Sequence, residues 1–362
     1  MAPRLGASAL KPLRHFALVL GGILLALLLS EATLRLVDAV PEVANPLYSF
    51  HDSDPVLGWR GRADVRLRFR RPQFDVEIAH DARGFRLPDP PPPAAPARRV
   101  LVLGDSFTWG WGVPQGAVYT DHLQRALPDL AIDNRGVNGF GTGQEYLLLE
   151  RALAARRYDV VLVQFFFNDV AENVDGKSGR RPVFRLDGDR LRRPAGALRP
   201  LSSPLLQWLK EHSRAFLLLD FTTRSLGGGN EAGPPLRPVT GSPPLDWRTM
   251  PGGELTWRLL EAIVATASAG GARVVIAYAP HRLELGAPDA VPPAVGAART
   301  LAGAAATASG AQWVDLTPAL APLGDAALFP GDEHWTPAGH AAVAAALLAA
   351  GALGDGNAAP LP

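Results

Sequence analysis

Residues 100–108 have the sequence VLVLGDSFT, and this stretch decides the predicted fold. Four consecutive aliphatic residues are typical of a parallel strand that is buried on both faces of its sheet. Gly104 then permits a sharp turn, and Asp105 and Ser106 follow it directly. Because functional groups in open α/β sheets gather at the carboxyl ends of the strands, Ser106 is a candidate nucleophile. A turn followed by a helix cap is the alternative interpretation of the same residues.

A candidate base and its partner lie near the end of the chain. A serine hydroxyl needs a base to take its proton, and the base needs a third group that fixes its tautomer. In residues 330–340, PGDEHWTPAGH, Asp332 lies two residues before His334, and the following Thr-Pro predicts a helix start that pins the loop. Glu333 is the alternative carboxylate partner. Two further alternatives are that Asp332 only caps a turn and that His340 lies on the helix face without contacts.

Two segments between the serine and the histidine offer donors for an oxyanion hole. Residues 132–141, IDNRGVNGFG, run from a short apolar stretch into a glycine-rich loop whose backbone N–H groups can approach a ligand closely. Residues 160–169, VVLVQFFFND, predict a second buried strand that ends at Asn168. We expect the Asn168 amide to lie beside the end of the first strand, although a simple Asn-Asp turn is the alternative.

In this order, the four segments resemble the SGNH/GDSL hydrolase family over about residues 100–350. The resemblance implies a flavodoxin-like three-layer α/β/α fold with a central parallel sheet, and serine-dependent acyl transfer without a cofactor or a metal. It also implies that Ser106 is the nucleophile, that His334 is the base and that Asp332 orients His334.

The same resemblance assigns the oxyanion hole to the N–H groups of Ser106 and Gly139 and to the Asn168 amide. Gly139 matches the family's glycine donor better than Gly136 does. Two family blocks differ here: residues 166–169 are FFND where the family usually has Gly-x-Asn-Asp, and Asp-x-His replaces Asp-x-x-His. The shorter spacing, followed by tryptophan, resembles SGNH members that are linked to polysaccharide acetylation.

The N-terminus predicts export. Basic residues precede an uncharged run at residues 16–30, and Glu31 and Arg35 interrupt a further apolar stretch that ends at Val37. Fifteen uncharged residues fit the core of a signal peptide, and a helix that continues to Val37 approaches the length of a membrane span. Glu31 and Arg35 would lie one turn apart near its outer end.

We expect a basic cytoplasmic segment at residues 1–15 and an uncleaved membrane anchor at residues 16–37, with the catalytic domain periplasmic. Secretion after cleavage is the alternative, and the candidate cleavage sites follow Ala32 and Ala39. The inner membrane is therefore an expected partner. The formal net charge of +1 gives no reason to expect nucleic acid, and the absence of cysteine excludes disulfides, thiolate metal sites and a cysteine nucleophile.

The positions of proline and glycine and the apolar patterns in the rest of the sequence predict how the chain is organised. We expect a small β-rich preface at residues 40–87, a proline-rich linker at 88–97, and a catalytic domain at 98–355 with an insertion at about 170–252. The hydrophobic content of 47% over 362 residues suffices for one sizeable core with appendages. Further predicted elements are strands at 65–70, 74–78 and 272–278, a hairpin at 183–191, and helices at 119–127, 144–155, 204–219 and 254–267.

These observations favour an exported esterase that acts on O-acyl, above all acetyl, esters of a carbohydrate or on a small ester. An O-acetyltransferase of the cell envelope or of exopolysaccharide is an alternative, and so is a non-catalytic glycan-binding protein with a hydrolase fold. Phe184 and Trp208 are interpreted as core residues, with stacking on substrate as the alternative. His281 follows a predicted strand and is interpreted as a surface histidine, with substrate contact as the alternative.

Overall fold

The computed structural model describes residues 10–37, 46–176, 178–226, 238–239 and 241–354. These residues form two compact units. One unit contains the N-terminal helix α1 and the two helices that follow residue 202, and the other contains the remaining elements. Each unit is described separately below.

A five-stranded parallel sheet forms the centre of the larger unit, in the order β6-β5-β7-β10-β11. In chain order this is 2-1-3-4-5, so the predicted flavodoxin-like fold is confirmed. The reversal of strand order falls at β5, between β6 and β7, which is where such sheets bind ligands. The strands are β5 Arg98–Leu103, β6 Leu130–Asn134, β7 Val160–Phe165, β10 Arg273–Tyr278 and β11 Gln312–Asp315.

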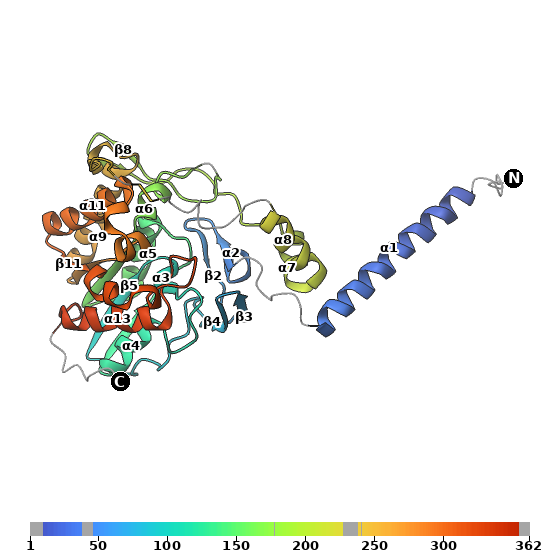
Figure 1. Ribbon diagram of the computed structural model, residues 1–362, viewed down its shortest axis with the longest axis horizontal. Coiled ribbons are helices and arrows are strands. Elements are labelled where there is room, and N and C mark those ends of the chain that lie inside the picture. The colour runs from blue at the N-terminus through green and yellow to red at the C-terminus, as the bar shows by residue number, and fades with distance from the viewer. Residues whose placement is uncertain (1–9, 38–45, 177, 227–237, 240, 355–362) are drawn as a thin grey trace. The chain divides into compact units, whose positions relative to one another are not determined.

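Helices cover both faces of this sheet (Figure 1). Alternate residues of β5 point to opposite faces: Leu101 and Leu103 join one hydrophobic core, and Val100 and Val102 join the other. The first face is covered by α5 Thr142–Ala155, α9 Gly253–Ala269 and α11 Pro293–Ser309, and the second by α4 Tyr119–Ala126 and α13 Pro337–Ala349.

Short elements complete the larger unit. The helices are α2 Pro46–Ser49, α3 Ser106–Trp109, α6 Asn168–Glu172, α10 Arg282–Gly286 and α12 Thr317–Leu320, with 3-10 turns at Trp247–Thr249, Pro288–Ala290 and Ala321–Ala326. Three two-stranded antiparallel pairs are β1 His51–Asp54 with β2 Gly58–Gly61, β3 Arg66–Arg71 with β4 Phe74–Ala79, and β8 Arg185–Asp187 with β9 Arg190–Arg192.

The strands of the preface, β1 to β4, pack on the elements around the central sheet and hold two of their loops. Trp59 of β2 is buried, and its indole N–H donates to the backbone oxygen of Asn138 at 3.0 Å. The indole N–H of Trp109 donates to His80 Nε2 at 2.8 Å, which joins α3 to the residue after β4. The preface therefore supports the turn after β5 and the loop after β6.

The proline-rich segment is also hydrogen-bonded to the larger unit. The backbone N–H of Asp89 donates to Asp121 Oδ1 at 3.1 Å, and the Arg125 guanidinium donates to the backbone oxygen of Asp89 at 3.0 Å. Both partners belong to α4, so the segment runs along this helix before β5 begins.

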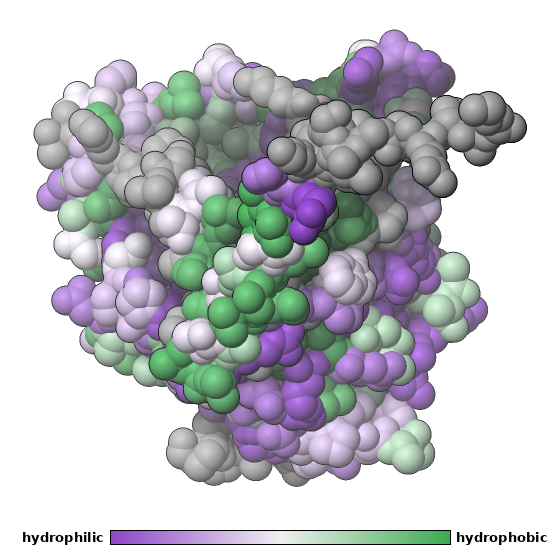
Figure 2. Space-filling model, turned by 90° about the vertical axis from the view of Figure 1, so that its right-hand side faces the viewer, coloured by the Kyte–Doolittle hydropathy of each residue, from purple (hydrophilic) through white to green (hydrophobic). Residues whose placement is uncertain are grey.

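The smaller unit contains α1 Leu10–Val37, α7 Pro204–His212 and α8 Arg214–Leu226. Within α1, Arg14–Val37 is long and apolar enough to cross a membrane, with a mean hydropathy of 2.1, although an N-terminal signal sequence has the same properties. In Figure 2 hydrophobic residues predominate along α1. The basic residue Arg4 and the candidate cleavage site after Ala39 lie outside the described residues.

The observed elements begin and end close to the predicted ones, with one clear exception. The single helix predicted at 204–219 is two helices that break at Ser213, whose backbone is extended. The break has a physical cause, because Ser213 Oγ accepts from the Phe216 N–H at 3.1 Å and so caps α8. Phe184 is a core residue, whereas Trp208 is 54% exposed, so the interpretation of Trp208 as a core residue is wrong.

Replacement of Trp59 by phenylalanine should destabilise the larger unit by about 1 kcal/mol or slightly more, because the Asn138 oxygen loses a buried donor. Amide hydrogen exchange in residues 136–140 should also become faster. The matched control is Trp257→Phe, since Trp257 stacks on Trp247 at 4.8 Å and is only partly buried. Unchanged stability and exchange in Trp59→Phe would show that this bond does not hold the loop.

Candidate active site

Ser106 is the first residue of α3 and lies directly after the turn that ends β5. The Asp105 carboxylate accepts from the Phe107 N–H at 2.9 Å and caps this short helix. A Cβ atom at position 104 would lie 2.2 Å from Thr108 Oγ1 and 2.6 Å from Gln164 Oε1, so only glycine fits the turn. The strand end and the cap fix the Ser106 backbone, and Ser106 is 9% exposed.

His334 and Asp332 lie on a loop that the start of α13 holds in place. Thr336 is the N-cap of α13, its Oγ1 accepts from the Gly339 N–H at 3.2 Å, and a proline occupies the first helical position. His334 Nε2 lies 2.7 Å from Ser106 Oγ, and His334 Nδ1 lies 2.6 Å from Asp332 Oδ1. The structure therefore brings these three sequence-predicted residues into one hydrogen-bonded chain.

The charge of Asp332 determines the tautomer of His334. Burial alone would raise the pKa of Asp332, but the charge and hydrogen bonds of His334 outweigh burial and lower this pKa to about 2. The carboxylate is thus ionised at neutral pH and can only accept. His334 Nδ1 must carry the proton, which leaves Nε2 free to accept from the Ser106 hydroxyl.

Glu333 points to a different set of partners. Its Oε2 accepts from the Arg282 backbone N–H at 2.9 Å, and its Oε1 lies 3.5 Å from His281 Nε2. The carboxylate that contacts His334 is therefore that of Asp332.

Two further histidines differ from the sequence interpretation. His281 is 2% exposed rather than on the surface, and its Nδ1 accepts from the Leu283 N–H at 3.2 Å at the start of α10. Burial lowers the pKa of His281 to about 4, so this ring is neutral at pH 7. His340 is also buried: its Nδ1 accepts from the Tyr119 N–H at 3.2 Å, and the two rings stack.

Trp111 contacts both members of the His334–Asp332 pair, and sequence reasoning missed it. Its ring stacks on the His334 ring at 4.7 Å with an interplanar angle of 17°, and its indole N–H donates to Asp332 Oδ2 at 3.1 Å. The signal was a Trp-Gly-Trp-Gly run just after the serine, at residues 109–112. Trp111 holds the second carboxylate oxygen and one face of the imidazole.

The three candidate oxyanion donors follow three adjacent strands. Ser106 follows β5, the loop with Gly139 follows β6, and Asn168 follows β7 at the first position of α6. Gly139 has φ +75°, a conformation that favours glycine. Within the described part of the chain, the N–H groups of Ser106 and Gly139 donate to no backbone carbonyl in a turn or loop. Asn168 Nδ2 donates to Glu172 Oε1 at 3.1 Å.

Four carboxyl groups near the ends of β5 and β7 and on α5 are buried together. They belong to Asp105, Glu145, Asp169 and Glu172. Burial, together with mutual repulsion, raises the pKa values of Glu145 and Asp169 well above the usual range. Burial likewise raises the pKa of Glu172 to about 7 and that of Asp105 to about 6. Among the described residues, no group of three or more His, Cys, Asp or Glu is arranged to hold a metal ion. Because their pKa values are raised well above the usual range, we expect Glu145 and Asp169 to be protonated at neutral pH.

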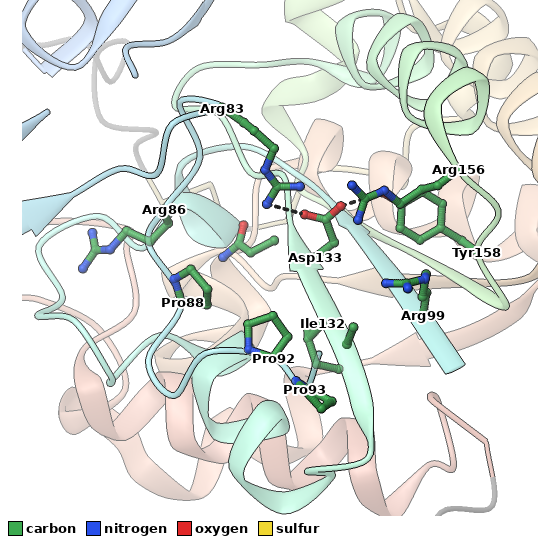
Figure 3. Close-up of a pocket in the computed structure, with 12 residues that line it drawn as sticks. Arg83, Arg86, Pro88, Pro92, Pro93, Arg99, Ile132, Asp133, Arg156 and Tyr158 are labelled. Atoms are coloured by element: carbon green, nitrogen blue, oxygen red, sulfur yellow. Dashed lines mark hydrogen bonds and ion pairs between the residues drawn. The ribbon is translucent and has the colours of Figure 1, made fainter. Parts of the chain in front are cut away.

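A cavity of about 230 Å³ lies along the edge strand β6, and Ser106, Asp332 and His334 do not line it. Figure 3 shows Asp133 in this cavity between the Arg83 guanidinium at 3.1 Å and the Tyr158 hydroxyl at 2.5 Å. Prolines 88, 92 and 93 of the proline-rich segment line its other side. The Asp133 carboxylate thus already partners groups of its own chain.

Comparison with known proteins now identifies the family. The model of the GDSL-like Lipase/Acylhydrolase family matches residues 102–342, which include Ser106, Gly139, Asn168, Asp332 and His334. The chain belongs to this family. It is accordingly a GDSL-like hydrolase that acts on ester bonds, and the family model spans two thirds of its length.

Several solved structures are similar to this GDSL-like hydrolase, at low sequence identity. TesA is 15% identical, with a TM-score of 0.42, over 70% of this chain and 98% of that one. The lipase/acylhydrolase from Enterococcus faecalis is also 15% identical, with a TM-score of 0.40, over 70% and 94%. Axe2, an acetylxylan esterase from Geobacillus stearothermophilus, is 16% identical, with a TM-score of 0.40, over 71% and 94%. No curated protein sequence matches the chain.

Replacement of Asp332 by asparagine should lower kcat by on the order of 10⁴-fold, because the amide favours the wrong tautomer of His334. The control is Glu333→Gln, which removes a neighbouring charge that does not contact His334 and should leave kcat within a few-fold. Steady-state hydrolysis of a chromogenic acetyl ester measures both. A large loss in Glu333→Gln with a small loss in Asp332→Asn would reverse the assignment.

Replacement of Glu145 by glutamine should stabilise the protein relative to wild type increasingly as pH rises from 5.5 to 8.5. In the unfolded chain Glu145 loses its proton near pH 4.5, whereas burial keeps it protonated in the folded protein. Above pH 4.5 the unfolded state therefore binds fewer protons, and wild-type stability falls by up to about 1.4 kcal/mol per pH unit. The variant lacks this titration.

Thermal or urea unfolding of both proteins across this pH range measures the difference. The buried histidines titrate alike in both proteins, so their contribution cancels. The control is Glu150→Gln, since Glu150 lies at the surface and pairs with Arg193 at 2.7 Å. A stability difference between Glu145→Gln and wild type that does not change with pH would mean that Glu145 is already ionised in the fold.

Proposed function

We propose that the protein is an exported, membrane-anchored serine esterase that hydrolyses short O-acyl esters of a carbohydrate or of a small alcohol. The observation that carries this proposal is the continuous chain from Asp332 through His334 to Ser106, with contacts of 2.6 and 2.7 Å. These are the distances that a nucleophile, a base and an orienting acid require.

In the proposed reaction, Ser106 Oγ attacks the ester carbonyl carbon while His334 Nε2 takes the hydroxyl proton. The alcohol then leaves with that proton, and the acyl group remains on Ser106 as an ester. Water attacks the carbonyl carbon of this ester while His334 takes a proton from the water. The bond between that carbon and Ser106 Oγ then breaks, His334 returns its proton to Ser106 Oγ, and the carboxylic acid leaves. Asp332 stays ionised throughout and stabilises the imidazolium, in keeping with its low pKa.

We assign the oxyanion hole to the N–H groups of Ser106 and Gly139 and to the Asn168 amide. The adjacent ends of β5, β6 and β7 support this assignment, as does the bond from Asn168 to Glu172, which orients the amide. Rigid donors of this kind act on the charge that develops on the substrate oxygen, without reorganising during the reaction.

Aromatic rings around Ser106 favour a small acyl group. The Phe107 ring lies 4.8 Å from that of Phe166 and 5.0 Å from that of His334, and Trp111 covers the other side of His334. The preface adds to this enclosure, since Gln73, between β3 and β4, donates to the backbone oxygen of Pro330 at 3.2 Å. Acetyl fits such a site more readily than a long chain.

The apolar helix α1 supports the proposed membrane setting. Its apolar stretch Arg14–Val37 has the length of a membrane span, and basic residues lie at its N-terminal end. In keeping with the positive-inside tendency, we propose that this end lies in the cytoplasm and the catalytic unit on the opposite side.

The decisive test compares wild type with Ser106→Ala and Asn168→Ala, each as the full chain in detergent, on p-nitrophenyl acetate. Ser106→Ala should be inactive and should not react with a fluorophosphonate probe. Asn168→Ala should still react with the probe but should lose on the order of 10²-fold in kcat, because one oxyanion donor is missing.

The acceptor is identified in the same assay by adding a bare oligosaccharide. Acetate in solution, with no acetyl on the sugar, supports hydrolysis, whereas acetyl on the sugar would make the protein a transferase that uses the same residues. An absence of turnover and of Ser106 labelling would overturn the catalytic proposal in favour of a glycan-binding protein.

A further inference from the structure

The helices α7 and α8 expose large apolar side chains. Leu205 and Trp208 of α7 are 68% and 54% exposed, and Leu218 and Leu219 of α8 are 39% and 58% exposed. Large leucines are rarely this accessible on neighbouring helices of a water-soluble unit unless the surface binds something. The exposed side chains define a patch on the smaller unit, called here the hairpin patch.

Several described polar side chains of this helix pair have partners within the pair itself. Lys210 of α7 and Asp220 of α8 face each other at 3.9 Å, and their side chains are only 7% and 14% exposed. The hydroxyls of Thr222 and Thr223 donate to the carbonyls of the residues four positions earlier, at 2.7 and 2.9 Å. A charge pair turned inward, with Leu205, Trp208 and Leu219 turned outward, differs from the usual pattern on a water-facing helix.

Hydrogen bonds join the α7–α8 pair to the apolar helix α1. Glu31 of α1 accepts hydrogen bonds from Ser213 Oγ and from the N–H groups of Arg214 and Ala215, at 2.9 to 3.0 Å, and so caps the start of α8. Arg35 pairs with Glu31 at 2.7 Å and donates to the backbone oxygen of His212 at 2.8 Å.

These bonds explain how two charged residues are tolerated in the membrane-length stretch of α1. An unpaired carboxylate within an apolar span is costly, and the turn between α7 and α8 supplies three of the donors that Glu31 needs. The same bonds keep the hairpin patch beside the C-terminal end of the span, where the leucines of α1 are themselves exposed.

We infer that the hairpin patch lies in the interface of the lipid bilayer, as a second membrane-binding element beside α1. The inference rests on the proposed membrane anchoring by α1 and extends it. We take the bilayer as the occupant because hydrogen bonds join the α7–α8 pair to the C-terminal end of the membrane-length helix α1. Its composition also suits the boundary, since Trp208 belongs to the class of side chains that prefer the headgroup region.

Single cysteine labels test this inference, because the chain has no cysteine of its own. Leu205→Cys and Leu219→Cys are labelled with the fluorophore NBD in the full chain, which is reconstituted into phosphatidylcholine and phosphatidylglycerol vesicles. Leu25→Cys, in the middle of α1, reports on the anchor. Ala154→Cys, exposed at the end of α5, is the water-facing control.

The labels at positions 205 and 219 should emit at shorter wavelength than the label at 154. Lipids with a shallow doxyl quencher should quench them more than lipids with a deep one. The label at 25 should show the opposite preference, and the label at 154 should respond to neither. Acetyl ester hydrolysis by the same vesicles shows that the catalytic unit is folded and tests the esterase proposal separately.

Three outcomes would overturn the inference. If the labels at 205 and 219 behave like that at 154 while the label at 25 is quenched, α1 is anchored but the hairpin patch faces water. Emission at short wavelength without quenching by lipid would mean that protein, such as a second copy of the chain, covers the patch. An unquenched label at 25 would remove the anchor itself, whether or not the vesicles hydrolyse the ester.

Discussion

The contact between Ser106 and His334 joins two loops that are 228 residues apart in the chain, and the site depends on it. Neither loop can place its side chain alone. Ser106 is fixed by the turn after β5, where any side chain at position 104 would collide with Thr108 and Gln164. His334 is fixed by the capped start of α13, a helix that packs on the same sheet. The parallel sheet sets the distance between these two supports.

Several layers of contact keep this chain of groups aligned. Trp111 holds the far oxygen of Asp332 and one face of the imidazole, while Glu333 is held elsewhere by Arg282 and His281. The hydrogen-bond partners thus direct these two neighbouring carboxylates to different groups. The ionised Asp332 also contrasts with the buried carboxyl cluster around Glu145, which burial favours in the protonated form. Environment, rather than residue type, sets the charge in each case.

The smaller unit differs from the larger one in which side chains it buries and which it exposes. The larger unit buries its apolar residues against a sheet, whereas α1 and the α7–α8 pair expose leucines and bury a charge pair. The bonds from Glu31 and Arg35 are what make these three helices one unit. An ester hydrolase built in this way would combine a compact unit that carries the Ser106 site with a helical unit that we propose binds lipid.

The sequence by itself determined the parallel fold and the candidate nucleophile, base and acid. Aliphatic runs that end in Gly-Asp-Ser and Asn-Asp, and a Thr-Pro helix start after His334, are local signals that burial and capping impose on the chain. The sequence left Asp332 and Glu333 as alternative partners of His334, and it did not indicate a role for Trp111. The direction in which these side chains point leaves no local sequence pattern. The sequence also led to two wrong predictions, a surface position for His281 and a single helix in place of α7 and α8. Only the tertiary structure decided these points, since the Glu31, Arg282 and Trp111 contacts join residues distant in the chain, whose side-chain directions no sequence periodicity specifies.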